Sequence, residues 1–150
     1  MTDEFTSIIT TRLQGLAKSV AESNGRIFVE VPRESLLEVA KILKDEHDGY
    51  HISTITVLDS GDNYEIIYHI PAGGKLVNLR VFVPKNDPSV ETLTEILPGA
   101  ILYERELHDI MGINVKNHPD MRALLLPDSW GDKGHPLRKD WVDPRTKGVR

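Results

Sequence analysis

Three extended segments separated by short turn-forming stretches constrain the fold of this chain more than any other feature. They cover residues 50–58, 64–70 and 75–84, and the stretches between them are rich in Gly, Pro, Asp and Asn. In the last segment, valine or leucine occupies every second position from 77 to 83, with Asn78 and Arg80 between them. This alternation is typical of a sheet with one solvated face, and short loops join neighbouring antiparallel strands. The sequence therefore predicts an antiparallel three-stranded meander.

Helical periodicity precedes this meander. Apolar residues recur at helical spacing over residues 3–20, so we expect an amphipathic helix that Thr2 or Asp3 opens and Asn24-Gly25 ends. Residues 27–31 alternate as a short strand, and a second helix is expected over residues 33–47. Most apolar helical stripes face a core, which makes a partner-docking role for the first helix the minority interpretation.

Two more helices are expected after the meander. Asp87-Pro88 predicts a short helix that runs to Leu97, and Pro98-Gly99 separates it from a longer helix that begins at about Ala100. The order is helix, strand, helix, meander, two helices and tail. It predicts an α+β fold in which a mostly antiparallel sheet packs with helices.

Charged side chains crowd the helix that is expected from Ala100. Glu104, Arg105, Glu106 and Asp109 lie within six consecutive residues, beside apolar positions that belong to the core-facing side. Glu106 and Asp109 share the edge nearest the apolar face, where desolvating carboxylates is costly unless cations or backbone donors meet them. We therefore expect these side chains to have partners elsewhere in the fold or on another chain. Gly112 fits the position just past a helix end, where a left-handed conformation is favourable.

The C-terminal stretch shows no periodicity. We expect a globular α+β domain over residues 1–113 and an extended arm over residues 114–150, broken by turns. The arm nevertheless contains large apolar side chains, which disordered tails rarely have: Met121, Leu124, Leu125, Leu126, Trp130, Leu137 and Trp141. They could cover the chain's own sheet or lie along another subunit. The enrichment of Trp and Arg in interface hot spots supports the second interpretation.

Composition excludes several classes of function. The net charge is −5 and the pI is near 5.6, whereas nucleic-acid binding generally needs a basic face. The chain has no cysteine, which excludes disulfides, Cys-ligated zinc and any Fe–S cluster held by its own thiolates. No apolar run approaches the roughly 20 residues that span a bilayer, and no signal-like segment is present. We expect a cytosolic protein that contacts a membrane only through partners.

The last third of the chain resembles a known family. The residues that carry the resemblance are Glu104-Arg105-Glu106-x-x-Asp109-x-x-Gly112-Ile113, His118-Pro119-Asp120-x-Arg122 and Pro136-Leu137-Arg138-Lys139-Asp140-Trp141. This pattern is similar to the 30 kDa (C) subunit of respiratory complex I and its relatives in energy-converting [NiFe] hydrogenases and F420H2 dehydrogenases. The family usually has glycine where this chain has Asn117. Asparagine tolerates the left-handed region well, so we expect the turn to be retained.

The resemblance implies a structural role. It implies a cofactor-free accessory subunit, not catalytic alone, on the cytoplasmic side of the cell membrane. Its partners would be the large hydrogenase-type subunit and Fe–S subunits, and Fe–S clusters and any NiFe centre would belong to those partners. On this basis Arg105→Ala should impair assembly, because a buried partner carboxylate would lose its counter-charge. The expected interface or network residues are Glu104, Arg105, Glu106, Asp109, Gly112, His118, Pro119, Asp120, Arg122, Arg138, Lys139, Asp140 and Trp141.

Two other classes of function remain open. His108, His118 and His135, together with the nearby carboxylates, could hold a metal in a small independent enzyme. No H-E-x-x-H or H-x-x-E-H spacing supports this, and ion-pair networks often imitate active sites. A soluble assembly or binding module is the third class. The resemblance also leaves open whether the complex is a hydrogenase, an F420H2 dehydrogenase or an NADH dehydrogenase.

Overall fold

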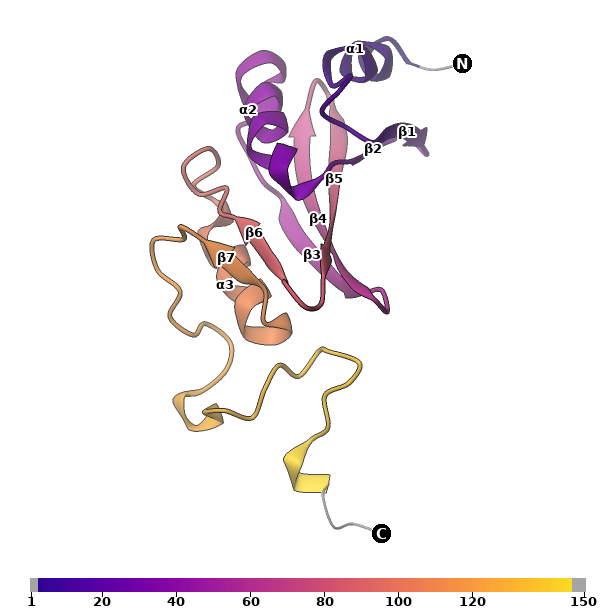
Figure 1. Ribbon diagram of the computed structural model, residues 1–150. Coiled ribbons are helices and arrows are strands. Elements are labelled where there is room, and N and C mark those ends of the chain that lie inside the picture. Colours follow the sequence, from indigo (N-terminus) through magenta and orange to yellow (C-terminus); the bar gives the residue numbers. More distant parts are fainter. Residues whose placement is uncertain (1–2, 147–150) are drawn as a thin grey trace.

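A five-stranded sheet forms the centre of the protein in a computed structural model, which describes residues 3–146 (Figure 1). Its strands lie in the order β1 (Ser19–Ser23), β2 (Arg26–Glu30), β5 (Lys75–Pro84), β4 (Asn63–Ala72) and β3 (Thr54–Asp59). Strands β3, β4 and β5 pair antiparallel, which confirms the predicted meander. Within this sheet, β2 and β5 pair in parallel. The predicted α+β class with a mostly antiparallel sheet is therefore confirmed.

In the described part of the chain, three α-helices accompany the sheet: α1 (Glu4–Arg12), α2 (Leu36–His47) and α3 (Ala100–Met111). A 3-10 turn, η1 (Arg33–Ser35), leads into α2, so the helix predicted over residues 33–47 is confirmed. In Figure 1, α1 and α2 lie near one end of the long β4–β5 hairpin, and α3 lies nearer the other end. Among residues 3–146, no helix has the length and apolar character needed to cross a bilayer.

The alternating positions of β5 form part of the core. Val77, Leu79, Val81 and Val83 are fully buried, as the periodicity predicts. The opposite face is less solvated than expected, because Asn78 is also buried. Its side-chain amide donates to the Ile27 carbonyl at 3.2 Å across the parallel β2–β5 pair. Pairing with β2 thus covers a polar residue that a meander alone would leave exposed.

The helix predicted over residues 3–20 is wrong in its second half. Asp3 does open α1, since its carboxylate accepts the Phe5 N–H at 2.9 Å, whereas Thr2 lies outside the described residues. The helix ends at Arg12, Gly15 has a left-handed φ of +84°, and residues 19–23 form β1. Asn24-Gly25 turns the chain between β1 and β2. Pairing with β2 therefore outweighs the helical spacing.

The short helix predicted from Asp87 to Leu97 is also wrong. Residues Ser89–Glu91 form strand β6, which pairs in parallel with β7 (Asn114–Lys116). The Arg33 guanidinium holds the start of this segment extended by donating to the Asp87 carbonyl at 3.0 Å. A distant strand and a distant arginine thus decide the local conformation. β7 lies within the stretch that the sequence assigned to the arm.

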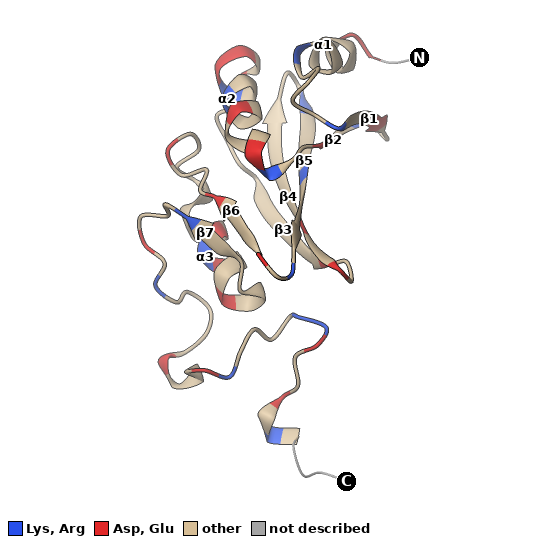
Figure 2. Ribbon diagram, in the orientation of Figure 1, with Lys and Arg blue, Asp and Glu red and all other residues tan. Residues whose placement is uncertain are grey.

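Beyond β7 the described chain forms bends and two 3-10 turns, η2 (Asp128–Trp130) and η3 (Pro144–Thr146). Figure 1 shows this segment passing beneath α3 and extending away from the sheet. Figure 2 shows Lys and Arg distributed from α1 through to this segment. We use the name "arm" below for residues 117–146.

Candidate functional site

Helix α3 carries four of the predicted site residues, Glu104, Arg105, Glu106 and Asp109, and it ends as the sequence predicts. Gly112 adopts a left-handed φ of +68°, and its N–H donates to the His108 carbonyl at 2.9 Å. A β-carbon built on Gly112 would lie 2.5 Å from the His135 ring and from the Arg138 guanidinium. Glycine is therefore required here both for the turn and for the close approach of the arm.

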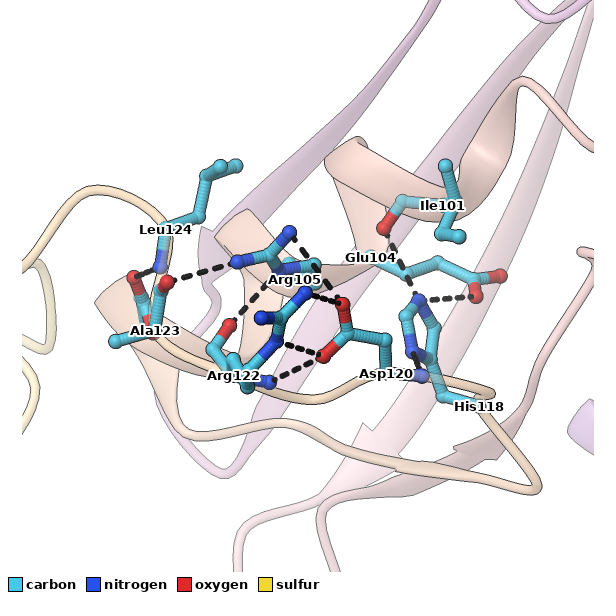
Figure 3. Close-up of polar contacts among 9 residues, drawn as sticks. Ile101, Glu104, Arg105, His118, Asp120, Arg122, Ala123 and Leu124 are labelled. Atoms are coloured by element: carbon cyan, nitrogen blue, oxygen red, sulfur yellow. Dashed lines mark hydrogen bonds and ion pairs between the residues drawn. The ribbon is translucent and has the colours of Figure 1, made fainter.

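Glu104 points into the protein interior from the first half of α3. Its side chain is fully buried and accepts the Leu93 N–H at 2.7 Å and the Thr92 hydroxyl at 2.5 Å. The imidazole Nε2 of His118 lies 3.7 Å from the same carboxylate (Figure 3). Burial raises the pKa of Glu104, although its hydrogen bonds counteract part of this effect. The carboxylate thus joins α3 to the segment that follows β6.

His118 fixes the first bend of the arm against α3. Its side chain is fully buried, Nδ1 accepts the Asp120 N–H at 3.0 Å, and Nε2 lies 3.0 Å from the Ile101 carbonyl. Because Nδ1 acts as an acceptor, the ring proton lies on Nε2, which donates to Ile101. The preceding Asn117 has a left-handed φ of +62°, so the expected turn is present.

Arg105 binds the next part of the arm. Its guanidinium donates to the carbonyls of Arg122 and Ala123, each at 2.8 Å, and lies 3.9 Å from the Asp120 carboxylate. Arg122 in turn donates to both oxygens of Asp120, at 2.8 and 2.7 Å (Figure 3). This pairing holds the pKa of Asp120 well below its usual range. All these partners belong to the same chain.

Asp109 holds three consecutive residues of the arm through one oxygen. Its side chain is only 5% exposed, and Oδ2 accepts the N–H groups of Leu124, Leu125 and Leu126 at 2.7, 2.8 and 3.3 Å. Burial acts to raise the pKa of Asp109, but the three backbone donors outweigh it and lower that pKa. The expected partners of this carboxylate are therefore backbone donors.

The second half of the arm returns to the end of α3. His135 Nδ1 lies 2.8 Å from the Asp109 carbonyl, and the Arg138 Nε donates to the Met111 carbonyl at 2.7 Å. The Arg138 guanidinium also lies 5.3 Å from the centre of the Tyr64 ring on β4. These contacts place the Pro136–Trp141 motif beside the helix end rather than free in solvent.

Asp59 is a site residue that the sequence analysis missed. Its side chain is 2% exposed and accepts the Lys85 ammonium at 2.7 Å and the Lys139 N–H at 3.0 Å. The Lys85 contact, together with the N–H groups of Lys139 and Gly61, lowers the pKa of Asp59 to about 2. Its position in a turn-rich stretch, 80 residues from Lys139, gives no sequence signal for this contact.

The remaining predicted residues lie nearer the surface. Trp141 stacks on Trp130 with 5.8 Å between ring centres, and its indole N–H donates to the Lys133 carbonyl at 2.6 Å. Glu106 is half-buried on α3, whereas Pro119 and Asp140 are exposed. The structure thus brings most of the predicted residues to one region, the boundary between α3 and the arm.

The three histidines of this region each bind a backbone carbonyl. His118 and His135 do so as described above, and His108 Nδ1 lies 3.0 Å from the Ile113 carbonyl. Within residues 3–146, no group of three or more His, Asp or Glu side chains is placed to hold a metal ion. The observed contacts give these histidines a structural role in fixing the helix end and the arm.

Comparisons with known proteins agree with the resemblance. The family model described as "Respiratory-chain NADH dehydrogenase, 30 Kd subunit" matches residues 29–147. The C subunit of the NADH-quinone oxidoreductase of Roseiflexus castenholzii is 36% identical over 127 residues, which cover 80% of this chain and 72% of the relative. Its counterpart in Geobacter sulfurreducens is 34% identical over 129 residues, covering 81% and 78%.

Solved structures share the fold. A chain of the membrane-bound sulfane sulfur reductase, an archaeal respiratory membrane complex, superimposes with a TM-score of 0.78 at 19% identity, covering 97% of this chain and 89% of that one. A trypsin-resistant fragment of Nqo5 superimposes with a TM-score of 0.60 at 22% identity, covering 76% and 96%. Because the family match runs from the end of β2 through β3–β5, α3 and the arm, this chain belongs to the family of the 30 kDa subunit of respiratory-chain NADH dehydrogenase.

Proposed function

We propose that this chain is a cofactor-free accessory subunit of a membrane-associated redox complex of the complex I and [NiFe]-hydrogenase superfamily. In this role it binds the large, hydrogenase-type subunit and helps to position it near the subunits that carry Fe–S clusters. Electron transfer and the coupled ion translocation take place in those partners. The chain reaches the cytoplasmic side of the membrane through them.

The observation that carries this proposal is the arm, which extends away from the chain's own sheet. Several of its apolar side chains are exposed, including Leu125 at 57%, Leu137 at 61% and Val142 at 60%. Such side chains gain little from folding against this chain, whereas burial against another protein would stabilise a complex. This supports assembly over catalysis by the chain alone.

The site geometry supports a structural mechanism. Arg105 and Asp109 on α3 bind backbone groups of the arm, and Arg138 on the arm binds the Met111 carbonyl at the end of α3. These contacts determine the path of the arm instead of presenting reactive atoms. A fixed path lowers the entropy that the arm loses on binding. The predicted network residues would thus act on assembly indirectly, by shaping the segment that meets the partner.

Copurification from the native host tests this proposal. The chain is tagged, membranes are solubilised gently, and the proteins that migrate with it on a native gel are identified. We expect a hydrogenase-type large subunit and Fe–S subunits in fixed ratio, and their identity distinguishes a hydrogenase from an F420H2 or NADH dehydrogenase. A chain that migrates alone as a monomer would refute the proposal.

A further inference from the structure

The contacts of the His118 imidazole fit only one protonation state of the ring. The ring is fully buried, Nδ1 accepts the Asp120 N–H at 3.0 Å, and Nε2 lies 3.0 Å from the Ile101 carbonyl (Figure 3). A neutral ring with its proton on Nε2 satisfies both contacts. A second proton, on Nδ1, would point at the Asp120 N–H and turn this hydrogen bond into a contact between two donors.

A buried carboxylate supports the uptake of that proton. Oε2 of Glu104 lies 3.7 Å from His118 Nε2, and both side chains are fully buried. A buried imidazolium is costly unless an opposite charge lies nearby, and an opposite charge within about 4–6 Å favours the charged form. The Leu93 N–H and the Thr92 hydroxyl hold the Glu104 carboxylate in this place. Glu104 therefore offsets part of the cost of an imidazolium at His118.

Two other ionisable groups near the bend keep their charge when an imidazole titrates. Arg122 and Arg105 flank the Asp120 carboxylate, and this pairing holds the pKa of Asp120 well below its usual range. Burial and the charge of Glu104 raise the pKa of Tyr68, whose hydroxyl has no hydrogen-bond partner within residues 3–146. Imidazole groups ordinarily titrate between about pH 5 and 8, where neither of these two groups changes charge. The titratable and charged groups that face the bend are Glu104 and Arg105 on α3, Tyr68 on β4, Glu91 and Glu95 in and after β6, and Asp120 and Arg122 on the arm itself.

We propose that His118 is a protonation-dependent latch, in which uptake of a proton at Nδ1 releases the Asp120 N–H and opens the first bend of the arm. The opening is confined to the start of the arm, because Arg105 still binds the carbonyls of Arg122 and Ala123. The path by which the arm leaves β7 therefore depends on pH. The latch acts within this chain alone, so it does not depend on the proposed function.

Nuclear magnetic resonance of the full, isotope-labelled chain tests the latch. The ring nitrogen shifts of His118 report its tautomer and its protonation. Hydrogen exchange, measured relative to an unstructured peptide at the same pH, reports the protection of the Asp120 amide. We expect the neutral Nε2–H form at about pH 7.5 and, with the same midpoint as the ring, a loss of Asp120 protection of at least about tenfold by about pH 5. The Lys139 amide is the internal control, because its acceptor Asp59 has a pKa of about 2 and stays ionised throughout.

Two variants separate proton uptake from loss of packing. His118→Asn keeps an acceptor for the Asp120 N–H, because an Asn side-chain oxygen binds the N–H two residues further on, but it takes up no proton. Its Asp120 protection should be the same at both pH values. Glu104→Gln keeps an acceptor oxygen and removes the charge, so the midpoint should shift to lower pH as the imidazolium loses its neighbouring carboxylate. Circular dichroism at about pH 7.5 checks that both variants fold.

The wild-type measurement decides the inference even if a variant fails to fold. A ring that takes up its proton while the Asp120 amide keeps its protection would overturn the latch. Loss of that protection while the ring stays neutral, or a ring that stays neutral until the whole chain unfolds, would overturn it as well. A pH response of His118→Asn equal to that of the wild type would have the same meaning. An unchanged midpoint in Glu104→Gln would refute the support assigned to Glu104.

Discussion

Replacing Glu104 gives the sharpest test of the network that joins α3 to the rest of the fold. In Glu104→Ala, the Leu93 N–H loses its acceptor in a fully buried place, which costs about 1–3 kcal/mol. The Thr92 hydroxyl keeps an alternative partner, because the Thr94 hydroxyl lies 2.9 Å away. One buried methylene group is also lost, at about 0.8 kcal/mol.

One effect acts in the opposite direction. Burial raises the pKa of Glu104, so removing this side chain also removes the cost of keeping a carboxylate out of water. We therefore expect a net loss of about 1–3 kcal/mol in the free energy of unfolding at pH 7. For a chain of this size that corresponds to a fall in Tm of roughly 2–12 °C.

Glu104→Gln is the matched control. Its amide oxygen can still accept from Leu93, and its amide NH2 can donate to the Thr92 oxygen, so it should cost less than about 1 kcal/mol. Because the folded pKa of Glu104 is raised from 4.5, its contribution to stability is full below that value and is lost as pH rises through the folded pKa. The Gln variant should lack this pH dependence.

Urea denaturation followed by circular dichroism, from pH 4 to pH 8, measures these differences. The reasoning is wrong if Glu104→Ala unfolds within about 0.5 kcal/mol of the wild type. It is also wrong if the Ala and Gln variants lose the same stability at pH 7, since the acceptor oxygen would then not be what matters.

Three further predictions concern the arm. Arg105→Ala should free the arm at Ala123 and raise the rate of tryptic cleavage after Arg122 by about tenfold. Arg105→Lys should protect this site only partly, because lysine lacks the planar fork of the guanidinium. Unchanged digestion of Arg105→Ala would contradict this prediction. Because the pKa of Asp59 is lowered from 3.8 to about 2, its contribution to the stability of the fold is present above pH 3.8 and is lost as pH falls through about 2. Tryptophan fluorescence should show this acid transition in the wild type and not in Asp59→Asn. Gly112→Ala should lower the free energy of unfolding by about 1–3 kcal/mol, more than Gly25→Ala, because Gly25 has a similar φ of +72° but open space around its β-carbon. Equal losses would exclude the clash.

The structure changes the reason for expecting Arg105→Ala to impair assembly. The sequence analysis placed a partner carboxylate beside Arg105, whereas the guanidinium binds two carbonyls of the arm in the same chain. Loss of assembly stays a prediction, now with displacement of the arm as its cause. Arg138 likewise binds a backbone carbonyl of the same chain, that of Met111 at the end of α3.

Patterns within a few neighbouring residues determined several elements of the fold. The β3–β5 meander, α2, α3 and the left-handed turns at Gly112 and Asn117 follow from periodicity and turn chemistry within a few residues. The family also follows from the sequence, because its signature lies in short motifs that the family comparison matches. These features depend little on what packs against them.

Tertiary structure alone determined two further strands and the contacts of the buried carboxylates. Residues 19–23 and 89–91 became strands because β2 and β7 offered them backbone partners, although the local patterns favoured helix. Likewise, Glu104 meets Leu93, and Asp59 meets Lys139, only after the fold brings them together. A helical pattern records side-chain spacing, whereas strand pairing and buried-charge contacts depend on donors and acceptors far away in the chain, which no local window contains.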